Sequence, residues 1–242
     1  MSRESLGSSP TQDRTEHLSL RPQRGGMNYS ITLVGLAIAL LAPPLFALWP
    51  QRIAGLSSLT GSLVLQLLYC ALVPLIVWIV VRWERLPLSS IGLHGFRWSS
   101  IGWGLVLWLT TALLLPLLTG PLVARFGSGG MHEGLRTLAN HPAWLLVVIG
   151  ASGGIVEETL YRGYALERLV SVTRSRWFAA VTVVVIFTLA HVPLWGLGFA
   201  LAADLPFAVV MTAFYLWRRD LVANALAHSL GLMMALPAAV IH

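Results

Sequence analysis

The fold is decided by residues 143–170, which read AWLLVVIGASGGIVEETLYRGYALERLV. Over the first twenty of these residues, the charged side chains are Glu157, Glu158 and Arg162. A helix needs about 20 predominantly apolar residues to cross the hydrocarbon core of a bilayer. An open sheet cannot cross it, because its unpaired backbone groups would find no water. The stretch therefore predicts a transmembrane helix that carries ionisable residues at depth.

Six further apolar segments flank this one, at residues 29–48, 58–81, 100–119, 177–192, 197–217 and 221–241. The whole chain of 242 residues is 56% hydrophobic and only 11% charged. Soluble domains carry about 25% charged residues. We therefore predict an all-α polytopic membrane helix bundle of about seven transmembrane helices. The net charge of +6 does not indicate nucleic-acid binding in such a chain.

The predicted domain organisation is a polar tail followed by one membrane domain. Residues 1–27 are rich in Ser, Arg, Gln and Gly and lack an apolar run, so we predict a disordered cytoplasmic tail. Residues 28–242 form the single membrane domain. The basic residues are all arginine. Twelve of the sixteen lie on the same side of the predicted membrane as the N-terminus, and three lie on the opposite side. Because arginine is retained on the cytoplasmic side, the chain is predicted to be a multi-pass protein of the cell or plasma membrane, with its N-terminus inside and its C-terminus outside.

Ionisable residues inside the apolar segments are candidates for function. A charged side chain at the centre of the bilayer costs about 2.5–3.5 kcal/mol on insertion scales, so each one implies a partner or a role. The residues in this position are Glu157, Glu158, Arg162, His191, Asp204 and His228. All but Asp204 lie in three segments. We interpret Asp204, which matches no motif, as a residue that hydrogen-bonds another helix.

Helical spacing separates the two adjacent glutamates. Glu158 and Arg162 are four residues apart with the acid first, which is the favourable order for an ion pair. Glu157 points about 100° away around the helix and lacks that partner. At about 1.5 Å per residue, Glu157 reaches the depth of His191 only if its helix continues past Arg162. We therefore predict one long helix with Arg162 buried, and a general base at Glu157.

Glycines next to Glu157 indicate a close helix contact. Gly150, Gly153 and Gly154 precede the acid, and Gly150 and Gly154 have the spacing at which small residues let another helix approach. The acid is therefore predicted to lie at a tightly packed seam between helices.

These residues resemble the CPBP intramembrane proteases, also called the CAAX prenyl protease 2 or lysostaphin-resistance type. That family carries E-E-x-x-x-R, F-x-x-x-H and H-x-x-x-N/D on three helices. Here the first two motifs are complete at Glu157–Arg162 and Phe187–His191, and the third begins at His228. The resemblance covers about residues 143–238. It implies an intramembrane endopeptidase that hydrolyses a peptide bond of a membrane-associated or lipidated substrate with a glutamate-activated water.

The resemblance also implies a role for each matching residue. Glu157 would be the general base, with His191 helping to hold the water, while Glu158 and Arg162 would support the site. His228 would help to bind the oxyanion. The chain departs from the family at Leu232, where the third motif has Asn or Asp. Asn224, one turn before His228 on the same helical face, is the candidate substitute as oxyanion donor.

Other functions remain open from the sequence. No cofactor is required by the proposed chemistry, but zinc is possible, held by Glu157, His191 and His228, although the His-Glu-x-x-His motif is absent. A non-catalytic membrane regulator or bacteriocin-immunity protein on the same scaffold is the main alternative. Buried Glu and His residues also occur in proton-coupled transporters. The predicted partners are the lipid bilayer and a membrane-embedded or lipidated protein or peptide, and not a nucleic acid.

Overall fold

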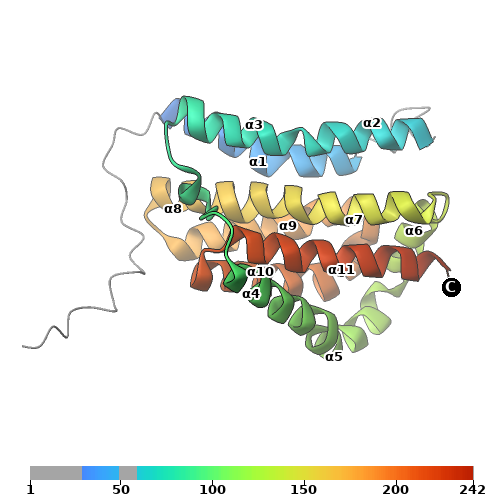
Figure 1. The fold of residues 1–242 in the computed structure, drawn as a ribbon. Helices are drawn as coiled ribbons and strands as arrows, with labels where there is room; N and C mark the ends of the chain where they lie inside the picture. The colour runs from blue at the N-terminus through green and yellow to red at the C-terminus, as the bar shows by residue number, and fades with distance from the viewer. Residues whose placement is uncertain (1–28, 49–58, 242) are drawn as a thin grey trace, which may run out of the picture.

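The computed structural model describes residues 29–48 and 59–241 (Figure 1). These two ranges contain helices, turns and bends but no strand, which confirms the predicted all-α class. The predicted tail at residues 1–27 lies outside the described residues, and so does the connection at residues 49–58.

The α-helices follow one another along the chain with short connections. They are α1 (Tyr29–Leu48), α2 (Leu59–Cys70), α3 (Leu72–Trp78), α4 (Trp98–Leu109), α5 (Leu115–Leu122), α6 (Ser128–Ala139), α7 (Ala143–Glu157), α8 (Glu167–Thr173), α9 (Arg176–Phe199), α10 (Leu205–Arg218) and α11 (Leu221–Ile241). Wider π-helical turns continue several of them, at Ile79–Trp83, Thr110–Leu114, Val123–Gly127, Glu158–Leu166 and Ala200–Asp204. A 3-10 turn lies at Leu88–Ile91.

Five stretches of the described residues are long and apolar enough to cross a membrane. They are Tyr29–Phe46, Leu59–Trp83, Trp98–Ala139, Ala143–Thr173 and Arg176–Arg218. A shorter apolar helix follows at Leu221–Pro237. This set supports an integral membrane bundle.

The stretch Arg176–Arg218 is folded back on itself and is not one rod. The rings of Phe187 and Phe207 lie 6.2 Å apart. Twenty residues of straight helix would separate them by about 30 Å. The change of direction lies at Gly196, whose φ of 74° is outside the helical region. The stretch thus contains two segments that pack against each other, in agreement with the two separate segments predicted at residues 177–192 and 197–217.

Helix α7 lies between the α1–α3 layer and α11 (Figure 1). A Cβ atom added to Gly150 would lie 2.7 Å from the backbone carbonyl carbon of Leu232, and one added to Gly154 would collide with the backbone of Ser229. Only glycine permits this approach of α7 to α11, so the predicted seam is confirmed.

Beyond α7, the same helix continues without a break to Thr173. Every residue from 158 to 168 is buried, and Arg162 is fully so. The predicted long helix with a buried Arg162 is therefore confirmed. At its far end Arg168 pairs with Glu84 at 2.8 Å, and Glu84 also accepts a hydrogen bond from Tyr164 at 2.9 Å. Breaking such a buried pair is strongly destabilising, so these contacts fix the end of the helix.

Candidate active site

The carboxylate of Glu158 is fully buried and is surrounded by three donors. A guanidinium nitrogen of Arg162 donates to Oε1 at 2.9 Å, and both side chains are 0% exposed. Nδ1 of His228 lies 2.9 Å from the same oxygen. Nδ2 of Asn224 donates to Oε2 at 3.2 Å. The predicted pair of Glu158 and Arg162 is confirmed, and α11 supplies the other two contacts.

The guanidinium of Arg162 is held on several sides. It donates to the hydroxyl of Thr212 and to the carbonyl oxygen of Ala208, each at 3.4 Å. Its central carbon lies 4.4 Å from the ring centroid of Phe187. A buried charge is tolerated only when it is paired and hydrogen-bonded. Arg162 meets that condition and thereby ties the Glu158–Leu166 turn to α9 and α10.

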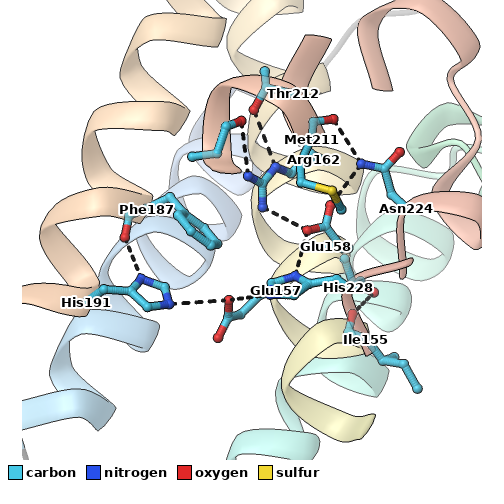
Figure 2. Close-up of polar contacts among 12 residues, drawn as sticks. Ile155, Glu157, Glu158, Arg162, Phe187, His191, Met211, Thr212, Asn224 and His228 are labelled. Atoms are coloured by element: carbon cyan, nitrogen blue, oxygen red, sulfur yellow. Dashed lines mark hydrogen bonds and ion pairs between the residues drawn. The ribbon is translucent and has the colours of Figure 1, made fainter. Parts of the chain in front are cut away.

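Glu157 faces away from Arg162 and towards two histidines (Figure 2). Its Oε2 atom lies 3.8 Å from Nε2 of His191 and 3.9 Å from Nε2 of His228. Its Oε1 atom accepts a hydrogen bond from the hydroxyl of Tyr69 at 3.4 Å. Oε2 itself is buried and has no hydrogen-bond partner among residues 29–48 and 59–241. The structure thus brings Glu157 together with His191, which was predicted to lie at the same depth, and with His228.

Both histidines are oriented through Nδ1. This atom lies 2.8 Å from the carbonyl oxygen of Phe187 in His191, and 2.9 Å from the Glu158 carboxylate in His228. Carbonyl and carboxylate oxygens only accept, so each Nδ1 carries a hydrogen. In the neutral form of either ring, Nε2 then directs a lone pair towards Glu157. The site therefore has three acceptor atoms facing one another.

Phe187 explains why the second motif begins with phenylalanine. Its ring is 4.5 Å from the ring of His191, with an angle of 31° between the planes, and it also contacts the Arg162 guanidinium. Its carbonyl oxygen accepts from the same histidine. Phe187 thus positions His191 through both its ring and its backbone.

Asn224 differs from its predicted role. Its two amide hydrogens are accounted for by Oε2 of Glu158 and by the carbonyl oxygen of Met211 at 3.0 Å. No hydrogen is left to donate to an oxyanion. The geometry makes Asn224 a positioning residue for Glu158. Leu232 lies one turn beyond His228, where it packs against the α7 seam 3.6 Å from a Cβ built on Gly153.

The donor types of Glu157, His191 and His228 would suit zinc, but their spacing does not. Two ligand bonds of about 2.1 Å at the tetrahedral angle place the donor atoms about 3.4 Å apart. The observed separations are 3.8 and 3.9 Å. Within residues 29–48 and 59–241, no group of three or more His, Cys, Asp or Glu side chains is arranged to hold a metal ion.

Tyr69 is a site residue that the sequence does not predict, because a tyrosine in an apolar span is usually a packing residue; its hydroxyl at that depth is the signal that could have indicated it. Asp204 is predicted from the sequence to hydrogen-bond another helix. Its Oδ2 is instead buried without a partner in the part of the chain that the structure describes. Its carboxyl interacts electrostatically with His191, Glu157 and His228.

Comparison with known families identifies the part of the chain that holds this site. Residues 139–233 match the family model described as type II CAAX prenyl endopeptidase Rce1-like. The matched segment is similar to that family, and the predicted family resemblance is thereby confirmed. It contains both glutamates and both histidines of the site, whereas Tyr69 lies outside it. No curated protein and no solved structure was found to match the chain.

Proposed function

We propose that the protein is an intramembrane endopeptidase that hydrolyses a peptide bond of a membrane-embedded or lipidated substrate. One observation carries this proposal. The Oε2 atom of Glu157 is buried, has no hydrogen-bond partner in the described part of the chain, and faces Nε2 of His191 and of His228 at 3.8 and 3.9 Å. These separations exceed a direct hydrogen bond of about 2.7–3.2 Å, so a water molecule can lie between the three groups. It donates to Glu157 and to one neutral imidazole, and it accepts from the other imidazole when that ring is protonated.

Glu157 is the proposed general base. The bridging water donates one hydrogen to Glu157, and its oxygen attacks the carbonyl carbon of the scissile peptide as Glu157 takes the proton. A C–O bond forms and the carbonyl oxygen becomes an oxyanion. When the C–N bond breaks, the proton on Glu157 passes to the leaving amine. The step consumes one water and needs no other reactant.

His228 is the proposed oxyanion donor. In its protonated form, Nε2–H points to the same side as Glu157, while Nδ1–H remains on Glu158 at 2.9 Å. A buried carboxylate in this position stabilises the imidazolium and fixes its ring. Arg162 and Asn224 hold Glu158 in turn. Removal of one oxyanion donor typically lowers the rate by about 10²–10³-fold.

The location of the site defines the class of substrate. Glu157 lies within the span Ala143–Thr173, so the scissile bond must reach bilayer depth. A substrate with a lipid anchor or an apolar segment can do so. We place the protein in the cell membrane with the N-terminus inside, because arginines predominate on that side.

A second candidate is a non-catalytic membrane regulator. It is favoured by the third motif, where Leu232 packs into the seam and both amide hydrogens of Asn224 are already used. In that case Glu157 would be a structural carboxylate. Its replacement by glutamine would then leave the cellular activity intact.

The test is digestion of candidate membrane peptides by the purified full chain in lipid nanodiscs, read by mass spectrometry. Glu157→Gln is expected to abolish cleavage, because the amide cannot accept the proton of the water. The matched control is Glu133→Gln, at an exposed glutamate of α6, which should cleave normally. Full cleavage by Glu157→Gln would refute the proposed mechanism.

A further inference from the structure

Helix α2 presents one polar face to α7. Between Gly61 and Val81, the side chains with a hydroxyl or an amide group are Ser62, Gln66 and Tyr69. Their spacing of four and then three residues places them on one side of the helix. The stretch Leu59–Trp83 has the highest mean hydropathy of the five candidate spans, at 2.6. Apart from the exposed Thr60 in the first turn of α2, the hydroxyl and amide groups of this apolar stretch therefore lie on one face, which implies a role there.

Each of the three residues meets a polar partner next to α7 or on it. Ser62 pairs with His141 at 2.8 Å between Oγ and Nε2, Gln66 donates to Ser152, and Tyr69 donates to Glu157 at 3.4 Å. We call these six residues the polar seam. It begins at His141, just before α7, and ends at the proposed general base.

Burial around Glu157 is asymmetric along its helix. On the side of α8, every residue from 158 to 168 is buried. On the side of His141, Ala151 and Ser152 are half-buried and Ile155 is 47% exposed. Glu157 and His191 keep side-chain exposures of 14% and 21%. The site is therefore closed towards α8 and less completely covered on the half that the polar seam follows.

Hydrolysis requires a fresh water molecule in every cycle, and lipid does not supply it. Side chains that donate and accept hydrogen bonds can pass water between them, since a bridging water replaces a direct hydrogen bond at little cost. We propose that the polar seam is the route by which water reaches Glu157 from the end of the bundle that carries His141. The use of this water rests on the proposed function, but the route itself is a property of the α2–α7 contact.

The test measures access of water-soluble reagents to single cysteines. In a Cys70→Ala background, Gln66→Cys and Ser152→Cys probe the seam. Leu67→Cys is the matched control, because Leu67 is adjacent on α2 and 70% exposed on another face. Leu160→Cys, at a fully buried residue on the α8 side, is the second control. Each variant is incubated in nanodiscs with a charged methanethiosulfonate, and labelling is followed by mass spectrometry.

Both seam cysteines are expected to react about tenfold faster or more than the cysteine of Leu67→Cys, because a charged reagent is strongly excluded from lipid. Leu160→Cys should stay unlabelled. Equal labelling of the seam and of Leu67→Cys would overturn the route. Should one seam variant fail to fold, Ser62→Cys tests the same expectation one turn nearer the surface.

A further variant separates this inference from the proposed function. Glu157→Gln in each cysteine background should leave labelling unchanged, since access does not depend on catalysis. Fast labelling without cleavage of any peptide by the parent chain would support the route and reject the peptidase. Cleavage by the parent chain together with slow labelling of the polar seam would support the peptidase and reject the route.

Discussion

Nδ1 of His228 lies 2.9 Å from Oε1 of Glu158, and this contact joins α11 to the helix of the two glutamates. The adjacent carboxylates therefore have different tasks. Glu158 is enclosed by Arg162, Asn224 and His228, and it fixes the histidine. Glu157 is left to face the two Nε2 atoms and, in the proposed mechanism, the reacting water.

Glu158→Gln should reduce both stability and activity. It removes the charge that neutralises Arg162, and a buried ion pair that loses one partner typically costs about 3–5 kcal/mol. The expected result is a clearly lower Tm and loss of cleavage. Glu157→Gln should lose cleavage with a Tm near that of the parent chain. Thermal unfolding of both variants in detergent checks this, and equal Tm values would contradict the division of roles.

Tyr69→Phe should slow cleavage without weakening substrate binding. The variant removes only the hydroxyl that donates to Glu157 and keeps the ring, which lies 5.6 Å from that of Phe46. Loss of one hydrogen bond of about 0.5–1.5 kcal/mol corresponds to a fall in kcat of about two- to twelvefold, with KM unchanged. Tyr29→Phe, at an exposed position of α1, is the control. A change confined to KM would show that Tyr69 contacts substrate instead.

Asn224→Ala should destabilise the site, and Leu232→Asn should not improve it. The first change leaves Oε2 of Glu158 and the carbonyl of Met211 without their donor, which costs about 1–3 kcal/mol. The second change places an amide against the glycines of α7, where Leu232 packs, and not beside the proposed oxyanion. Initial rates and Tm values check both. A gain of about tenfold or more in Leu232→Asn would instead place the oxyanion donor where the family motif has it.

Gly154→Ala should separate α7 from α11. The added methyl group would collide with the backbone of Ser229, and overpacking of this kind costs about 1–3 kcal/mol. Cleavage should fall with Tm, because Glu157 and His228 lie on the two helices that move apart. Gly102→Ala is the control, since nothing lies within 4 Å of its added Cβ. Equal stability of the two variants would be inconsistent with the close seam.

Chelation should leave cleavage unchanged. The proposed chemistry needs only a water, and among residues 29–48 and 59–241 no group of three or more His, Cys, Asp or Glu side chains is arranged to hold a metal ion. The measurement is peptide cleavage after dialysis against a zinc chelator, with and without added zinc. Loss of cleavage that zinc restores would assign Glu157, His191 and His228 as metal ligands.

The sequence by itself determined the helices and the contacts within them. Apolar length predicted the spans because lipid requires internally hydrogen-bonded backbone. The i to i+4 spacing predicted the pair of Glu158 and Arg162, since helical geometry alone brings them together.

Only the tertiary structure decided which atoms of different helices meet. The turn at Gly196, the hydroxyl of Tyr69 on Glu157, and the use of both Asn224 hydrogens by Glu158 and Met211 depend on how distant segments pack. Periodicity fixes which face of a helix a side chain occupies, but not which helix that face meets. The sequence predicts which face of its helix Asn224 occupies. It does not predict which acceptors the amide hydrogens meet, because these depend on how α11 packs against the helix of Glu158 and against α10.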